Sequence, residues 1–176
     1  MTIAALGGGK LRRKFSIPTG VSPAQVALAV EPDGAKLWVL WTQGGYLWAT
    51  RLRDAARAAA PIVVKARLPG GRTPYALESI GLAGEAEAVL NLGGTGGNAL
   101  WQTQLLPGLA AHASRTPRPT VRIRDDIAPV KGATLRGGGR VAQTNAKGRA
   151  SLKGFKRHAL VKVSKTGYAG TSFRVP

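Results

Sequence analysis

The side chains that could act on a ligand are mostly cations, and two short clusters concentrate them. Arg12-Arg-Lys14 lies near the start of the chain, and Lys153-Gly-Phe-Lys-Arg157 lies between two strand-like segments. Closely spaced Lys and Arg side chains attract polyanions. We predict that Lys153, Phe155, Lys156 and Arg157 contact an anionic polymer; the alternative is that this cluster is an ordinary solvated loop.

Residues that bind metal ions are too scattered to predict a metal site. The chain has no Cys, which removes thiolate ligands and disulfides. His112 and His158 have no acidic neighbours at ligand spacing, and Asp125-Asp126 is a carboxylate pair at the start of a loop. Such a pair could bind Ca²⁺ but is more typical of a turn. We therefore expect no metal site.

Motifs for catalysis or cofactor binding are missing from the sequence as well. Ser151 lacks the G-x-S-x-G setting of a hydrolase nucleophile. The glycine runs Gly7-Gly-Gly-Lys10 and Gly93-Gly-Thr-Gly-Gly97 lack the spacing of a phosphate-binding loop. We expect no catalytic residues and no cofactor, so the chain is predicted not to be an enzyme.

The net charge is large and unevenly distributed. The chain has 26 Lys and Arg against 8 Asp and Glu, a net charge of +18. Residues 1–110 hold 11 basic and 6 acidic residues, whereas residues 111–176 hold 15 basic and 2 acidic ones. No acidic residue follows Asp126. This field favours binding to nucleic acid, anionic glycans, anionic cell-wall polymers or acidic lipid, with a merely solubilising surface as the alternative.

Residues 120–176 alternate between apolar and polar side chains, as strands with one buried face do. Turn residues at 137–139, 145–148 and 165–167 interrupt the alternation at the spacing of a small sandwich. The pattern predicts six strands, at Thr120–Arg124, Ala133–Arg136, Arg140–Thr144, Gly148–Leu152, His158–Val163 and Ser172–Val175.

Three phrases in this stretch carry a resemblance. They are Pro129-Val-Lys-Gly-Ala-Thr-Leu135, Thr144-Asn-Ala-Lys-Gly-Arg-Ala-Ser-Leu152 and Val161-Lys-Val-Ser-Lys-Thr-Gly-Tyr168. In order and spacing they resemble the carboxypeptidase-regulatory-like and related Ig-like or transthyretin-like domains. The resemblance implies a β-sandwich accessory domain that stabilises or presents a ligand and does no catalysis. Such domains are often neutral or acidic, whereas this copy is strongly basic.

The middle of the chain contains an internal repeat. Leu47-Trp-Ala-Thr-Arg-Leu52 and Leu100-Trp-Gln-Thr-Gln-Leu105 share the pattern L-W-x-T-x-L, 53 positions apart, and a glycine turn precedes each. Two further strands precede each turn, and a fourth strand is expected in the first copy at Ile62–Ala66. The predicted preceding strands are Gln25–Val30, Lys36–Trp41, Tyr75–Ile80 and Glu87–Leu92.

A repeat of this length built from three or four antiparallel strands is typical of a β-propeller blade. Residues 24–107 resemble blades of secreted sialidase-like propellers of the BNR type, although the Ser-x-Asp-x-Gly-x-x-Trp box is absent. Two blades cannot close a ring of about 4–8 blades. We therefore expect either the C-terminal part of a larger propeller or another packing. The four Trp residues, 38, 41, 48 and 101, are expected in the core between blades, with a sugar-binding surface as the alternative.

These patterns predict an all-β chain with four zones. A flexible basic lead-in covers 1–20, two propeller-blade-like repeats cover 21–107, a linker covers 108–119, and an Ig-like or regulatory-like sandwich covers 120–176. No apolar run approaches the ~20 residues needed to span a bilayer. The start does not resemble a signal peptide, because the basic residues follow the short apolar stretch.

Three functions are compatible with these observations. The first is a non-catalytic extracellular or surface-associated module, the C-terminal part of a larger secreted propeller protein, whose basic sandwich anchors to an anionic glycan or cell-wall polymer. A cytoplasmic location would follow if the chain is complete. The second is a nucleic-acid-binding protein, which rests on charge alone. The third is a fragment of a propeller-type glycoside hydrolase, which no acid pair at usable spacing supports.

Overall fold

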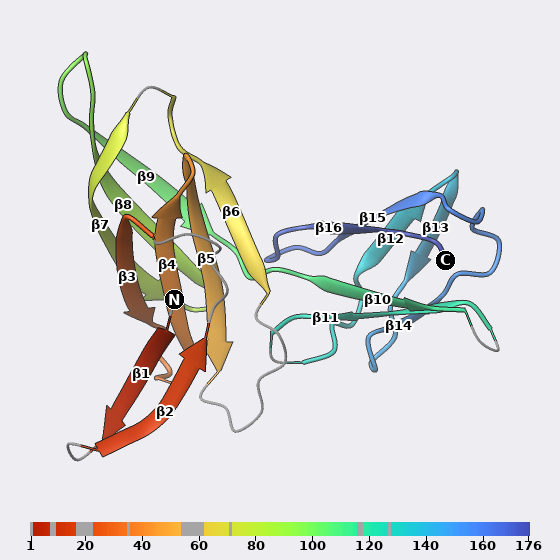
Figure 1. The fold of residues 1–176 in the computed structure, drawn as a ribbon. Helices are drawn as coiled ribbons and strands as arrows, with labels where there is room; N and C mark the ends of the chain where they lie inside the picture. Colours follow the sequence, from red (N-terminus) through yellow and green to blue (C-terminus); the bar gives the residue numbers. More distant parts are fainter. Residues whose placement is uncertain are drawn as a thin grey trace.

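The structure, a computed structural model, describes residues 2–7, 10–16, 23–34, 36–53, 62–70, 72–115, 118–126 and 128–176. For residues 2–7, 10–16 and 53 it describes the backbone only. Every regular element in these ranges is a β-strand, which confirms the prediction of an all-β fold (Figure 1). No helix that could cross a lipid bilayer occurs within the described ranges.

The N-terminal region, residues 23–105, is a chain of consecutive antiparallel strands in two sheets. The first sheet has the order β3-β4-β5-β6 and the second the order β7-β8-β9. Each predicted strand of this region is present; β3 has the predicted bounds, β6 is shifted by one residue, and the others are longer by one to four residues. The bounds are β3 Gln25–Val30, β4 Lys36–Gln43, β5 Tyr46–Arg53, β6 Val63–Arg67, β7 Thr73–Leu82, β8 Glu85–Gly93 and β9 Ala99–Leu105.

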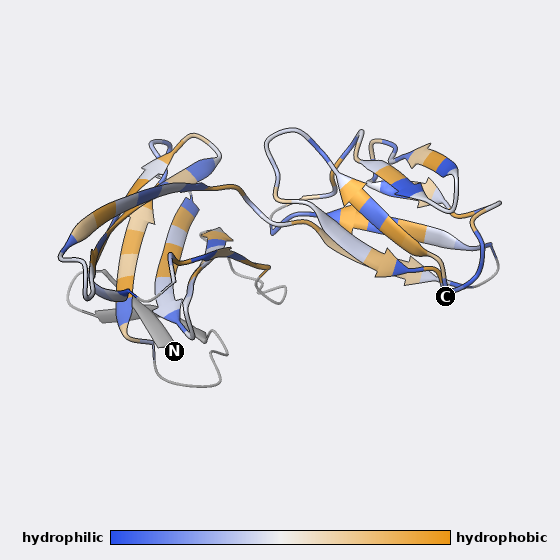
Figure 2. Cartoon of the chain, turned by 90° about the horizontal axis from the view of Figure 1, so that it is seen from above, coloured by the Kyte–Doolittle hydropathy of each residue, from blue (hydrophilic) through white to orange (hydrophobic). Residues whose placement is uncertain are grey.

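The two sheets pack face to face over a shared apolar core. The first sheet contributes Trp38, Leu40 and Leu47, and the second contributes Leu90 and Leu92. These side chains are almost completely buried, and Figure 2 shows apolar positions recurring along the facing strands. Burial of this apolar surface at about 25 cal/mol per Å² is the main force that holds the sheets together.

The two copies of the L-W-x-T-x-L repeat bury different residues in this core: the first copy turns its Leu inward, and the second turns its Trp inward. Leu47 lies between the sheets, whereas Trp48 lies on the other face of the first sheet, where it stacks on Trp41. In the second copy Trp101 packs against the core between the sheets, and Leu100 is 78% exposed. Leu47 points from the first sheet toward the second, and Leu100 points from the second sheet away from the first, so equivalent residues point in the same direction. The two sheets are therefore stacked head to tail.

The C-terminal unit, residues 108–176, contains two further sheets. One has three strands in the order β10-β11-β14, and the other has four in the order β13-β12-β15-β16. Their bounds are β10 Ala110–Ser114, β11 Thr120–Arg124, β12 Thr134–Gly137, β13 Arg140–Gln143, β14 Arg149–Ser151, β15 Leu160–Ser164 and β16 Thr171–Arg174.

Alternating residues of both sheets form one core in the C-terminal unit. Val121 and Ile123 come from β11, and Leu135, Val161 and Val163 come from the four-stranded sheet. All five are buried, so the alternation in the sequence correctly identified the inward faces. The sheets pack through these side chains and leave their polar partners on the two outer faces.

Gly148 is required by the turn that precedes β14. Its φ of +67° lies in the left-handed region, and a Cβ at this position would lie 2.3 Å from the carbonyl oxygen of Ile123. Asn145 supports the same turn, because its side-chain oxygen accepts hydrogen bonds from the backbone N–H groups of Lys147 and Arg149. The glycine predicted from the sequence thus joins the turn closely to β11.

Two segments expected to be irregular contain strands. Residues 110–114, within the predicted linker, form β10 and pair with β11 in register from Ala110↔Arg124 to Ser114↔Thr120. Residues within the predicted lead-in form a hairpin of β1 (Thr2–Gly7) and β2 (Lys10–Ser16). The rest of the lead-in, 17–20, lies outside the described residues. Alanine and glycine have low strand propensity, so these segments could not be recognised as strands from their sequences; pairing of the backbone with a neighbouring strand makes them strands.

Candidate anion-binding surface

The predicted cationic cluster forms the loop between β14 and β15. Lys153, Lys156 and Arg157 are exposed, whereas Phe155 is half-buried and packs against the core of the C-terminal unit. The Phe155 N–H also donates a hydrogen bond to the carbonyl of Leu152, at 3.1 Å. The phenyl ring therefore anchors the loop from below, and the three cations extend into solvent.

Two cations that are distant from this loop in the sequence lie next to it in the structure. Arg174 on β16 donates a hydrogen bond of 3.1 Å to the carbonyl oxygen of His158. The guanidinium of Arg140 lies next to Gly154, within 4 Å of where a Cβ would stand there. His158 is exposed and has a positive φ of 62°, which turns the chain into β15. The loop is thus the basic end of the C-terminal unit.

A second group of cations lies on the outer face of the four-stranded sheet. Because Leu135 and Val163 are buried register partners, the next pair along the strands, Arg136 and Lys162, points outward. Arg174 lies on the same face of β16, opposite the 49%-exposed Leu160. We call this set, Arg136, Lys162 and Arg174, the outer-face cations.

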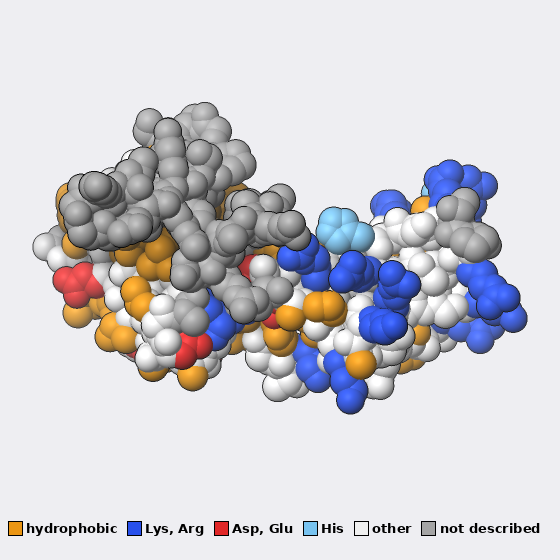
Figure 3. All heavy atoms as spheres, turned by 90° about the horizontal axis from the view of Figure 1, so that it is seen from below, with side chains coloured by type: hydrophobic (Ala, Val, Ile, Leu, Met, Phe, Trp, Pro, Cys, Tyr) orange, Lys and Arg blue, Asp and Glu red, His pale blue; other side chains and the backbone are white. Residues whose placement is uncertain are grey.

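The outer-face cations include a cross-strand pair of like charges. Arg136 and Lys162 are direct register partners, an arrangement that normally destabilises a sheet. Among the described residues, no carboxylate forms an ion pair with any Lys or Arg after Asp126. The positive potential of this face is therefore not neutralised by the described part of the protein, and Figure 3 shows Lys and Arg gathered over the C-terminal unit.

The outer face of the three-stranded sheet is basic as well. Arg122 and Arg149 are register partners on β11 and β14, and His112 on β10 is the register partner of Arg122. All three side chains are exposed. The C-terminal unit thus has two basic faces, joined at one end by the loop of residues 153–157.

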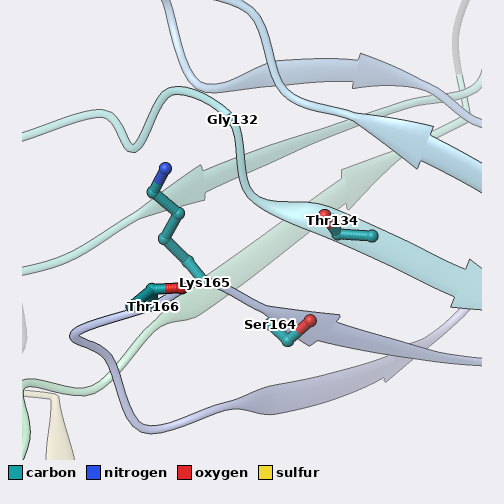
Figure 4. Close-up of a pocket in the computed structure, with 5 residues that line it drawn as sticks. All are labelled: Gly132, Thr134, Ser164, Lys165 and Thr166. Atoms are coloured by element: carbon teal, nitrogen blue, oxygen red, sulfur yellow. The ribbon is translucent and has the colours of Figure 1, made fainter.

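A polar depression lies at the other end of the four-stranded outer face. It has a volume of about 370 Å³ and is lined by Gly132, Thr134, Ser164, Lys165 and Thr166 (Figure 4). Thr134 and Ser164 are register partners, one step of the alternation away from Arg136 and Lys162. Three hydroxyl groups and one ammonium group are therefore continuous with the outer-face cations.

The two acidic residues of this part of the chain belong to a different environment. Asp126 accepts hydrogen bonds from Arg51 on β5, at 2.9 Å from Nη2 and at 3.1 and 3.2 Å from Nε. Arg51 Nη2 also lies 3.5 Å from Asp125 Oδ2. The carboxylate pair considered as a Ca²⁺ ligand thus contacts a guanidinium, and the contact joins the N-terminal region to the C-terminal unit.

Arg51 is surrounded by acceptors from both parts of the chain. Its Nη1 lies 3.5 Å from Glu31 Oε1, and the same oxygen accepts a hydrogen bond of 3.1 Å from the indole of Trp38. Burial lowers the pKa of the guanidinium, but the hydrogen bonds and charge of Asp126 outweigh that effect and raise it. Arg51, Glu31, Asp125 and Asp126 form a network that we call the buried ion cluster.

Tyr168 belongs to the buried ion cluster rather than simply covering the core. Its hydroxyl donates a hydrogen bond of 3.1 Å to Asp125 Oδ2. Burial, together with the negative charge of Asp125, raises the pKa of this hydroxyl above its ordinary value. The cluster is satisfied by internal partners, so it has the character of a structural contact.

No three His, Cys, Asp or Glu side chains gather as metal ligands in the described ranges. Trp38 is buried between the two sheets and Trp101 packs against the same core, whereas the buried Trp41 and the half-buried Trp48 stack on the other face of the first sheet. Comparison of the chain with models of protein families, with curated proteins and with solved structures found no match.

Proposed function

We propose that the chain is a non-catalytic binding module whose basic C-terminal unit attaches to an anionic polysaccharide, at the cell surface or outside the cell. The observation that carries the proposal is the Arg136–Lys162 pair, two like charges held side by side with no ion pair to a described carboxylate and continuous with the polar depression at Thr134 and Ser164. A polyanion laid across the outer face would relieve this repulsion. The exposed cations of the loop at 153–157 would extend the contact beyond the sheet.

A polysaccharide is favoured over nucleic acid by the placement of the aromatic rings. The aromatic residues of the C-terminal unit are Phe155, Tyr168 and Phe173, and all three pack against its core. Proteins that bind single-stranded nucleic acid usually offer exposed rings on which bases stack. The outer faces offer cations and hydroxyl groups instead, which suit the charged substituents and hydroxyls of a glycan chain.

The finer architecture is part of the same proposal. We propose that the C-terminal unit is a regulatory-like, Ig-like sandwich, supported by its two facing sheets and its alternating core. For the N-terminal region we propose propeller-type blades, supported by the head-to-tail stacking of equivalent faces. The apolar outer face of the first sheet, with Val39 and Trp41, also suits a blade, which buries both faces.

Hydrolase activity is not part of the proposal. The carboxylates Glu31, Asp125 and Asp126 are brought together from distant parts of the chain, and they surround Arg51. A glycosidase needs two carboxyl groups that flank an open substrate position. Here a guanidinium occupies the space between them.

The experiment compares two matched pairs of charge removals. Both Arg136→Gln/Lys162→Gln and Arg122→Gln/Arg149→Gln remove one exposed cross-strand pair of like charges, the first from the four-stranded sheet and the second from the three-stranded sheet. Binding to heparin, a sulfated polysaccharide, and to duplex DNA is measured by calorimetry at salt concentrations from about 50 to about 200 mM. Over this range the affinity for a polyanion falls steeply, because binding releases counterions.

The proposal predicts tighter binding to heparin than to duplex DNA at equal salt concentration. The first double variant is expected to lower the salt slope of log K by about 1.5, since each lost contact releases about 0.7–0.9 fewer counterions. The second is expected to change it much less. Equal losses in both variants would mean that net charge alone drives binding, and preferential binding to DNA would support the nucleic-acid alternative instead.

A further inference from the structure

We propose that the depression lined by Gly132, Thr134, Ser164, Lys165 and Thr166 is a subsite for one tetrahedral oxyanion, a sulfate or phosphate ester on a sugar of the bound polymer. The inference rests on the proposed function and specifies the kind of substituent that the same surface recognises. We refer to this depression as the oxyanion pocket.

The donors of the oxyanion pocket come from two neighbouring strands and the turn that follows one of them. Thr134 on β12 and Ser164 on β15 are register partners and belong to the outward-facing set of their strands. Lys165 and Thr166 follow directly in the turn, and Figure 4 shows the Lys165 side chain rising toward the segment of Gly132. One ammonium and three hydroxyl groups thus line one depression.

Gly132 keeps that space open. Its φ is +70°, and a Cβ at this position would lie 3.2 Å from Lys165 Nζ, closer than a side chain normally approaches. A side chain here would strain the backbone, and the Lys165 ammonium would have to shift away from it. Because glycine has no side chain, the Lys165 ammonium can lie directly beside the backbone at the edge of the pocket.

The wall that contains Gly132 is held in place by a buried threonine. Thr144 is 5% exposed, and its hydroxyl donates to the carbonyl of Val130 at 2.6 Å and accepts from the N–H of Ala133 at 2.9 Å. The N–H of Gly132 also donates to the Thr144 carbonyl, at 2.8 Å. This side of the pocket is thus formed before any ligand binds, which lowers the entropic cost of binding.

The chemistry of the lining residues selects an oxyanion. Hydroxyl groups and an ammonium group can all donate hydrogen bonds to anionic oxygens, and charge-assisted bonds of this kind are the strongest of their class. Neither a carboxylate nor an aromatic ring is among the five lining residues, so a cation or a stacked neutral sugar has no partner there. The four donors that line the depression can bond to the several oxygens of a sulfate or phosphate group, and its volume of about 370 Å³ leaves room for the sugar that carries the ester.

The position of the pocket also fits a polymer. Strands rise by about 3.3 Å per residue, so Arg136 and Lys162 lie about 7 Å along their strands from Thr134 and Ser164. A chain with one anionic group in the pocket could place a neighbouring group over the outer-face cations. The pocket would then set the register of the polymer, and the outer-face cations would add affinity.

The test uses small ligands that the pocket could hold alone. Glucose 6-sulfate, glucose 6-phosphate and glucose are titrated into the 176-residue chain, and backbone and lysine resonances are followed by NMR. We expect saturable shifts at Gly132, Ser164, Lys165 and Thr166 with both esters and none with glucose. The tighter-binding ester then identifies the sulfated or the phosphorylated polymer as the better partner.

Two variants locate the binding. Lys165→Met should weaken binding of the preferred ester at least fivefold, whereas Lys147→Met, which removes another exposed lysine of the same unit, should leave it unchanged. Arg136→Gln/Lys162→Gln should weaken heparin binding but not binding of the monosaccharide ester.

Heparin binding without saturable ester shifts at the pocket, or equal effects of the two lysine variants, would overturn the pocket while leaving the proposed function intact. Ester binding at the pocket without heparin binding would overturn the proposed function and support an oxyanion site alone.

Discussion

Arg51 and Arg136 are the same residue type in two opposite situations. Arg51 is almost fully buried and lies among Glu31, Asp125 and Asp126, so its charge is compensated within the fold. Arg136 is exposed, faces Lys162 across the strand, and has no ion-pair partner among the described residues. Both acidic residues of the C-terminal unit, Asp125 and Asp126, lie at the first site, so no acid of that unit is left to pair with its other cations.

The comparison separates charges that hold the structure from charges available to a ligand. A buried charge is tolerated only when it is paired, because moving it out of water is costly. An exposed charge needs no partner, and a like-charged neighbour costs only a fraction of a kcal/mol to about 1 kcal/mol. Substitutions in the two regions should therefore affect different properties, stability in the first and binding in the second.

The largest effect is expected for Arg51→Met. The substitution would leave three carboxylates near one another with their common cation removed, which should lower the free energy of unfolding by about 3–5 kcal/mol. Arg149→Met, the same substitution on an exposed face, should change it by no more than about 0.5 kcal/mol. Urea denaturation of both variants at pH 7 provides the measurement, and equal effects would contradict the division of roles.

A smaller effect is expected for the coupling between Arg51 and Asp126. The bidentate contact joins the two halves of the chain, so the double-mutant cycle of Arg51→Met and Asp126→Asn should show a coupling energy of about 1–3 kcal/mol. Chemical denaturation of the four proteins of the cycle measures it. Additive effects would mean that the contact does not couple the N-terminal region to the C-terminal unit.

The sequence predicted the strands well because their signals are local. Val121 and Ile123, like Val161 and Val163, alternate with polar residues. In the fold these apolar residues are buried and the polar residues between them are exposed. β10 was not predicted, because Ala-Ala-His-Ala-Ser has small side chains and a proline-bearing segment follows it. Its pairing with β11 is a non-local preference that no short pattern contains.

The candidate surface was predictable only in part. The cluster at 153–157 could be found because its cations are adjacent in the sequence. Arg136 and Lys162 are 26 positions apart, and Arg51 and Asp126 are 75 apart, so only the strand register and the packing of the two regions bring each pair together. The inward orientation of Phe155 likewise depends on the core beneath the loop. A run of 50 residues without any acid was the one available signal that the cations after Asp126 lack local partners.

Alkaline pH should affect the buried ion cluster through Tyr168. Because its pKa is raised above the ordinary value of 10.0, the unfolded chain loses this proton first, and the contribution to stability declines as the pH rises above about 10. Tyr168→Phe should therefore lose less stability than the wild-type chain between pH 9 and pH 11. Urea denaturation at a series of pH values measures the difference, and parallel curves would show that the hydroxyl does not contribute.

The smallest effect on stability separates the two roles of charge most sharply. Arg136→Glu replaces a like-charged cross-strand pair with an opposite-charged one, so it should raise the free energy of unfolding by about 0.2–1 kcal/mol. The same substitution should weaken heparin binding by about tenfold or more, because it removes one cation of the outer face and adds an anion. Arg122→Glu on the other sheet is the matched control, since it should also stabilise but should change heparin binding much less.

The most direct test of the account is therefore to measure unfolding and heparin affinity on the same preparations of wild type, Arg136→Glu and Arg122→Glu. We predict that Arg136→Glu raises the free energy of unfolding and lowers the affinity for heparin, because the Arg136 cation repels Lys162 in the free protein and attracts the anionic ligand. Unchanged affinity in Arg136→Glu, or equal losses in both variants, would contradict the claim that the four-stranded face is the binding surface.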